Sequence, residues 1–141
     1  MDALRLAHLL FLASWGGLVL AETVLELGSR PDDAGAVQTA RLHFVIDALF
    51  EVPLLAGIVA TGALLLERAW PPTPLLVAKL ACAVIALGAN VYCAWLVLRR
   101  HRSAGDPAAV HRLASRIRLT GIGVPFGLVA LIIGLGWLHH G

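Results

Sequence analysis

The chain of 141 residues has the length of one domain, and its composition excludes an ordinary soluble protein. Hydrophobic residues make up 59% of the chain and charged residues 14%, with a formal net charge of +2. A typical soluble domain has about 25% charged residues. Because the few charges are clustered, long apolar stretches remain between them, and these stretches decide the fold class.

Four apolar segments are each close to the ~20 residues that an α-helix needs to cross the hydrocarbon core of a bilayer. They cover residues 4–27, 43–66, 74–98 and 119–138. Helices are the expected spanning form, because these segments lack the alternation of membrane barrel strands. The sequence therefore predicts an all-α integral membrane protein, with residues 1–141 forming a single antiparallel bundle of four transmembrane helices.

The first segment has a second interpretation, as a signal peptide with Arg5 as its basic flank and a cleavage site near Leu20-Ala21. A discarded leader would not need the polar side chains that this segment carries. We therefore expect it to remain as the first membrane helix.

Arginine placement predicts the orientation of the bundle. Residues 28–42 and 99–118, which link the first and second and the third and fourth segments, together contain eight arginines, whereas the other side has only Arg5 and Arg68. The positive-inside rule places these two loops in the cytoplasm and both termini outside. The basic loop lacks the aromatic pattern of a nucleic-acid surface, so anionic lipid is its expected contact and no nucleic-acid partner is predicted. Residues 108–118 are expected to form an amphipathic extension of the last helix.

Polar side chains inside the apolar segments are the strongest functional signal, because a charge at the bilayer centre costs about 2.5–3.5 kcal/mol on the insertion scale. Helical spacing places them on one face of each of three segments. The three faces are His8, Trp15, Glu22 and Glu26; His43, Asp47, Glu51 and Thr61; and Lys79, Cys82, Asn90 and Cys93. We expect these faces to turn inward together.

The depths of these residues predict two polar layers. Five acidic and histidine residues fall in the cytoplasmic leaflet, namely Glu22, Glu26, His43, Asp47 and Glu51. His8 and Lys79 fall together near the external side. Pro53 follows the acidic residues closely and is expected to bend the second helix beside them.

The five residues of the inner layer are predicted to bind one or two divalent transition metals, because carboxylate and imidazole ligands suit iron, manganese or zinc. Arg41 and Arg118 are the local cations in this interpretation, and both lie at the membrane edge. Two alternatives are proton or substrate handling and structural pairing with these arginines. The spacing differs from the Glu-x-x-His pattern of di-iron bundles.

Three classes of function remain open: a membrane-bound oxidoreductase, a transporter of metal ions or protons, and a structural subunit. The middle of the bundle is poor in polar groups, as at Val19, Leu54 and Ala86, which favours a bound site over a conduit. Small residues on the last helix can pack within the bundle or form a homo-oligomer interface. They are Gly123, Gly127 and Gly134.

A resemblance is carried by two motifs of the first segment, Leu4-Arg5-Leu6-Ala7-His8-Leu9-Leu10 and Ser14-Trp15-Gly16-Gly17. They resemble the first helix of a bacterial superfamily that includes the copper-resistance D proteins and the HemJ-type membrane protoporphyrinogen oxidases. Lys79 matches a lysine early in helix 3 of the HemJ type. The resemblance implies a bacterial inner membrane location, His8 as a ligand of haem b and Lys79 as a functional residue beside it. Ile122-Gly123-Val124-Pro125 departs from the HemJ-type pattern, which has an acidic residue here.

Overall fold

The computed structural model describes residues 2–28, 32–120, 127, 129 and 132, and this part of the chain is helical, without strands. The elements are α1 (Ala3–Leu27), α2 (Asp33–Ile46), a π-helical turn η1 (Asp47–Glu51), α3 (Val52–Arg68), α4 (Pro74–Arg102) and α5 (Pro107–Thr120). Helices are confirmed in the first three predicted segments and in the amphipathic stretch before the fourth. Most of residues 119–138 lies outside the described residues.

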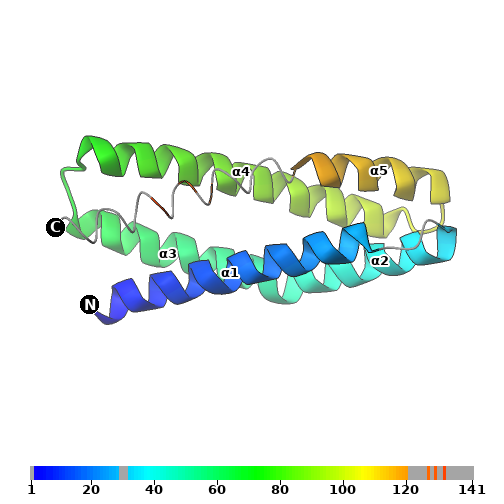
Figure 1. The fold of residues 1–141 in the computed structure, drawn as a ribbon, viewed down its shortest axis with the longest axis horizontal. Helices are drawn as coiled ribbons and strands as arrows, with labels where there is room; N and C mark the ends of the chain where they lie inside the picture. The colour runs from blue at the N-terminus through cyan, green and yellow to red at the C-terminus, as the bar shows by residue number, and fades with distance from the viewer. Residues whose placement is uncertain (1, 29–31, 121–126, 128, 130–131, 133–141) are drawn as a thin grey trace.

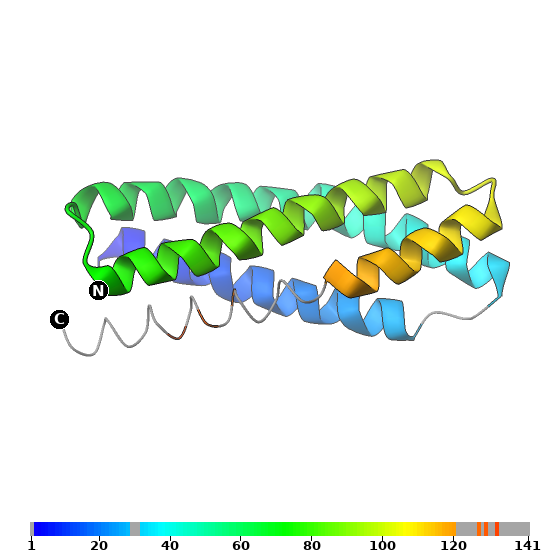
Figure 2. The same ribbon diagram turned by 90° about the horizontal axis from the view of Figure 1, so that it is seen from above.

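The long helices run along a common axis (Figure 1). α1 packs along α3, α4 packs along α5, and α2 contacts both α4 and α5. The view from above shows the same lengthwise packing (Figure 2). The end of α1, the continuous α2–η1–α3 segment and the second half of α4 therefore meet in one region of the bundle.

Side-chain caps explain where the helices begin. Asp2 accepts a hydrogen bond from Arg5 N at 2.9 Å, which caps α1 and holds the pKa of this exposed carboxyl below its usual value. Asp32 accepts from Gly35 N at 2.7 Å and caps α2. The second helix consequently begins at Asp33, well before the apolar run that starts at residue 43.

The turn before Pro53 is wider than an α-helical turn. The N–H of Val52 donates to the carbonyl of Asp47, five residues earlier, and Pro53 has no N–H to continue the regular pattern. The structure thus has a π-helical turn directly before the proline at which the sequence predicts a bend. Asp47 and Glu51 are buried at its two ends, while Leu49 and Phe50 between them are exposed.

Burial in the described residues is the reverse of that in a soluble protein. Eight buried side chains are polar or charged and seven are apolar, while many large apolar side chains are exposed. Three helical segments are long and apolar enough to cross a membrane. They are Ala3–Leu27, Asp33–Arg68 and Pro74–Arg102, and an 18-residue stretch within each has a mean hydropathy of 1.6, 2.1 and 2.0, respectively.

Candidate functional site

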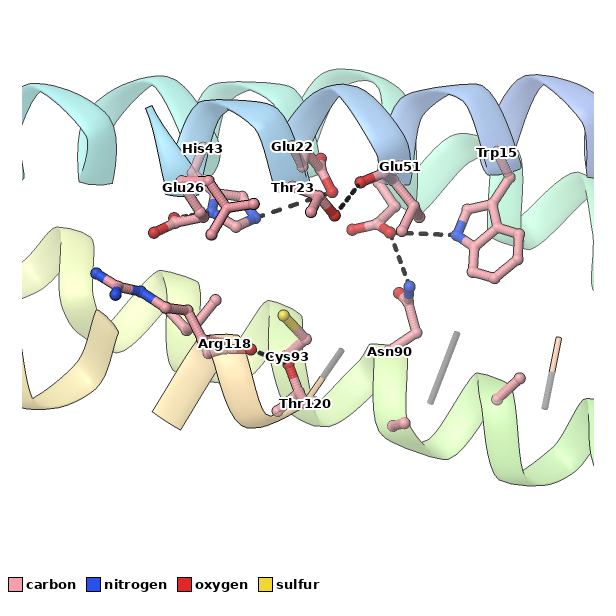
Figure 3. Close-up of a pocket in the computed structure, with 15 residues that line it drawn as sticks. Trp15, Glu22, Thr23, Glu26, His43, Glu51, Asn90, Cys93, Arg118 and Thr120 are labelled. Carbon is pink, nitrogen blue, oxygen red and sulfur yellow. Dashed lines mark hydrogen bonds and ion pairs between the residues drawn. The ribbon is translucent and has the colours of Figure 1, made fainter. Parts of the chain in front are cut away.

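The five predicted residues of the inner layer lie in the same region of the bundle, and all are buried. Glu22 and Glu26 come from α1, His43 from α2, and Asp47 and Glu51 from η1. Figure 3 shows four of them along one wall of a cavity, with Asn90 and Cys93 of α4 on the opposite wall. The three-helix convergence expected from the polar faces is therefore present here.

Three of the five form a compact group of possible metal ligands. Glu22, His43 and Asp47 each offer one ligand atom, and these atoms all lie within 4.8 Å of one another. His43 Nε2 is 3.4 Å from Asp47 Oδ1 and 3.9 Å from Glu22 Oε2. Glu22 Oε1 and both Asp47 carboxylate oxygens are buried, and no donor nitrogen or hydroxyl of the described residues gives them a hydrogen bond. The two carboxyl groups lie close enough to share a proton with each other. The group thus combines ligand atoms that lie close together with carboxylate oxygens that need either a proton or a cation.

The other ring nitrogen of His43 fixes the orientation of the imidazole. Nδ1 is 2.5 Å from Glu26 Oε1. An ionised carboxylate can only accept, so Nδ1 carries the proton and donates to Glu26. Nε2 is then directed toward Glu22 and Asp47. A carboxylate behind a histidine is the usual support of a metal-bound imidazole.

Arg100 of α4 holds Glu26 in place from the other side. Its Nη2 donates to Glu26 Oε1 at 2.5 Å and its Nη1 donates to Oε2 at 3.0 Å. The Arg100 side chain is only 1% exposed. Glu26 is therefore engaged by Arg100 and His43, and its position is that of a support for His43 rather than of a ligand in the compact group.

Glu51 is held by neutral hydrogen-bond donors. Trp15 Nε1 donates to Glu51 Oε1 at 3.2 Å and Asn90 Nδ2 donates to the same oxygen at 2.7 Å. Both bonds are visible in Figure 3. Asn90 Oδ1 is buried and accepts no hydrogen bond from the described residues.

The charges of the cluster do not balance within the described residues. Arg100 matches the charge of Glu26. His43 is the one basic side chain of the described residues at ion-pair distance from Glu22 or Asp47, and no basic side chain there lies so close to Glu51. Three carboxyl groups thus share a low-dielectric region in which they need either protons or a further cation.

His8 and Lys79 lie apart from this cluster. His8 is buried, and its Nδ1 is 2.8 Å from Thr61 Oγ1. Because Thr61 donates its own proton to the Gly57 carbonyl at 2.6 Å, His8 donates to Thr61. The ring also interacts with the Ile58 carbonyl and with the charge of Lys79, which is half-buried on α4.

A cavity of about 200 Å³ lies beside the cluster, between α1, α4 and α5. Glu22, His43 and Glu51 line it on one side. Among the described residues, the rest of its lining surface is mostly apolar and includes Val19, Ala86, Ala89 and Ile117, and Arg118 also borders it.

Gly127 lies inside the bundle. A Cβ atom at this position would come within 3.2 Å of the Trp15 ring and 3.7 Å of Ala86 Cβ. The absence of a Cβ atom at Gly127 therefore lets Trp15 and Ala86 of the same chain pack close to its backbone. Gly123 and Gly134, the other residues of the predicted small-residue face, lie outside the described residues.

Arg100 was expected in the basic loop of residues 99–118, and this expectation was wrong. α4 continues to Arg102, so Arg100 lies on the helix and turns inward. The missed signal is its spacing: Arg100 follows Cys93 by seven positions, two helical turns along the predicted polar face.

Comparisons of the chain with protein-family models, with curated proteins and with solved structures gave no match. The functional argument therefore depends on the geometry of the site.

Proposed function

We propose that the chain is an integral membrane protein that binds a divalent transition metal through Glu22, His43 and Asp47, and that this metal serves redox chemistry. One observation carries the proposal: the three buried residues place ligand atoms within 4.8 Å of one another, and three of their oxygens have no hydrogen bond from a nitrogen or hydroxyl donor of the described residues. Glu26 and Arg100 support the metal site by orienting His43.

The membrane location is supported by the reversed burial pattern. Leucine, valine and isoleucine side chains cover much of the outside of the helices, whereas about half of the buried positions of the described residues are polar or charged. Lipid is the solvent in which this arrangement is stable, since water would leave a large apolar surface exposed. We propose a bundle of four spans in a bacterial inner membrane, with the α1–α2 and α4–α5 loops in the cytoplasm and both termini outside.

This orientation is tested by labelling intact cells with a membrane-impermeant thiol reagent. In a background without Cys82 and Cys93, Glu67→Cys lies at the external end of α3 and should react, whereas Ala104→Cys in the α4–α5 loop should react only after lysis. Ready labelling of Ala104→Cys from outside would refute the orientation.

The donor set favours iron, manganese or zinc. Two carboxylates and one imidazole are harder ligands than the thiolates that select copper(I), and an imidazole is unusual for magnesium or calcium. Three protein ligands also leave coordination positions open, as in catalytic metal sites. Iron or manganese would supply the redox chemistry.

Metal analysis of the purified protein tests the proposal. Wild type should retain about one equivalent of iron or manganese after mild purification, and Asp47→Asn should lose most of it. One equivalent of zinc would support the metal site but contradict its redox role. Glu67→Gln, an exposed carboxylate far from the cluster, is the matched control and should retain the metal. The proposal fails if wild type has no stoichiometric metal and gains no thermal stability from added Mn²⁺, Fe²⁺ or Zn²⁺. Shared protons would then neutralise the carboxyl groups, and the chain would be a candidate proton carrier.

Haem binding at His8 is a second candidate, favoured by the buried ring and its bond to Thr61. A hydrogen bond at Nδ1 orients an imidazole so that Nε2 can ligate a metal. Purified protein from haem-replete cells should then show a Soret band that His8→Ala abolishes. A colourless preparation would remove this candidate and leave the Glu22–His43–Asp47 proposal untouched.

A further inference from the structure

We propose that the cavity between α1, α4 and α5 binds a lipid-soluble molecule with a single aromatic ring and a hydroxyl group, such as a phenol or a hydroquinone. The inference rests on the proposed function, because Glu22 and His43 line this cavity and also belong to the proposed metal site. It adds the chemical class of the ligand that the metal site would receive.

The size and walls of the cavity set the size of the ligand. Its volume is about 200 Å³. An apolar protein cavity of about 150 Å³ accepts benzene, so this one has room for one ring with small substituents. Val19, Ala86 and Ala89 present short apolar side chains, and the Trp15 indole adds an aromatic surface.

The polar groups of the cavity require a ligand that donates a hydrogen bond. Glu22 is 7% exposed and its Oε1 is unpartnered by the described residues, as is Asn90 Oδ1. Asn90 Oδ1 can only accept, and Glu22 Oε1 also accepts when its carboxylate is ionised at the proposed metal site. The nearby donors of Trp15 and Asn90 are already directed to Glu51. A hydroxyl group supplies the missing donor, and an uncharged ring can reach the cavity through lipid.

Fluorine NMR of the full chain in lipid nanodiscs tests the proposal, with empty nanodiscs to subtract partitioning into lipid. 4-Fluorophenol should bind saturably at one site per chain and about tenfold more tightly than 4-fluorotoluene, because the added hydroxyl satisfies a buried acceptor. Ala89→Leu, which fills the cavity, should abolish the saturable signal. Ala81→Leu, on the exposed side of α4, should preserve it.

Three results would overturn the inference: equal binding of the two probes, tighter binding of 4-fluorobenzoate through Arg118, or unchanged phenol binding in a folded Ala89→Leu protein. If Ala89→Leu does not fold, the three probes on wild type still decide. Metal content is measured on the same samples. Saturable phenol binding without metal would remove the proposed metal site alone, and stoichiometric metal without phenol binding would remove this inference alone.

Discussion

Glu26 and Arg100 are 74 positions apart in the sequence, yet two hydrogen bonds join their side chains inside the bundle. The pair connects the end of α1 to the end of α4 and also fixes the histidine of the cluster through Glu26. Removal of one partner of a buried ion pair leaves the other charge uncompensated, which costs more than the pair itself contributes.

Arg100→Gln should therefore lower the free energy of unfolding by about 3–5 kcal/mol. The neighbouring Arg99, which lies over the Trp95 ring at 4.8 Å, provides the control. Arg99→Gln should cost about 1 kcal/mol or less. Thermal unfolding of the detergent-solubilised proteins measures both effects. The double variant Glu26→Gln/Arg100→Gln should be more stable than Arg100→Gln, because it leaves no uncompensated charge of Glu26. Equal melting temperatures for the two single arginine variants would contradict a structural role for the pair.

Glu26→Gln should weaken metal binding by about 10- to 100-fold, the usual effect of altering a carboxylate behind a metal-bound histidine. The amide oxygen can still accept from His43 Nδ1, so the loss reflects the missing negative charge. Competition with a chromophoric chelator measures the affinity for Mn²⁺ or Zn²⁺ in folded protein, with Glu67→Gln as the control. An unchanged affinity would mean that Glu26 serves Arg100 only.

Gly57 is required by the close approach of α1 and α3. A Cβ atom at this position would lie 2.8 Å from the Phe11 ring, so Gly57→Ala should overpack the interface and cost about 1–3 kcal/mol. Gly88→Ala has nothing within 4 Å and should gain up to about 1 kcal/mol from helix propensity. If thermal unfolding gives both variants the same change, the packing of α1 on α3 differs from the one described.

The sequence was sufficient to predict the first three apolar helices and the residues of the inner layer, because both follow from spacing. Apolar length predicted the helical segments, and steps of four and seven placed Glu22, His43 and Asp47 on inward faces. The partners of these residues depend on which helices meet, which spacing along one helix does not specify. Arg100 was missed because a run of arginines at a helix end resembles a basic cytoplasmic loop. The π-helical turn was missed because Pro53 is compatible with several kinds of bend.

We expect Pro53 to affect metal binding through the π-helical turn that precedes it. Pro53→Ala restores an N–H, which permits a regular α-helical turn in place of η1 and rotates Asp47 and Glu51 relative to His43. The free energy of unfolding should be unchanged or higher by up to about 3 kcal/mol, the usual cost of an interior proline. Metal affinity should fall at least tenfold, which corresponds to a loss of about 1.4 kcal/mol in binding free energy. Pro74→Ala at the first turn of α4, where no N–H is needed, should change neither quantity. Thermal unfolding and chelator competition on the same samples measure both effects, and a Pro53→Ala protein with wild-type metal affinity would show that the π-helical turn does not position the ligands.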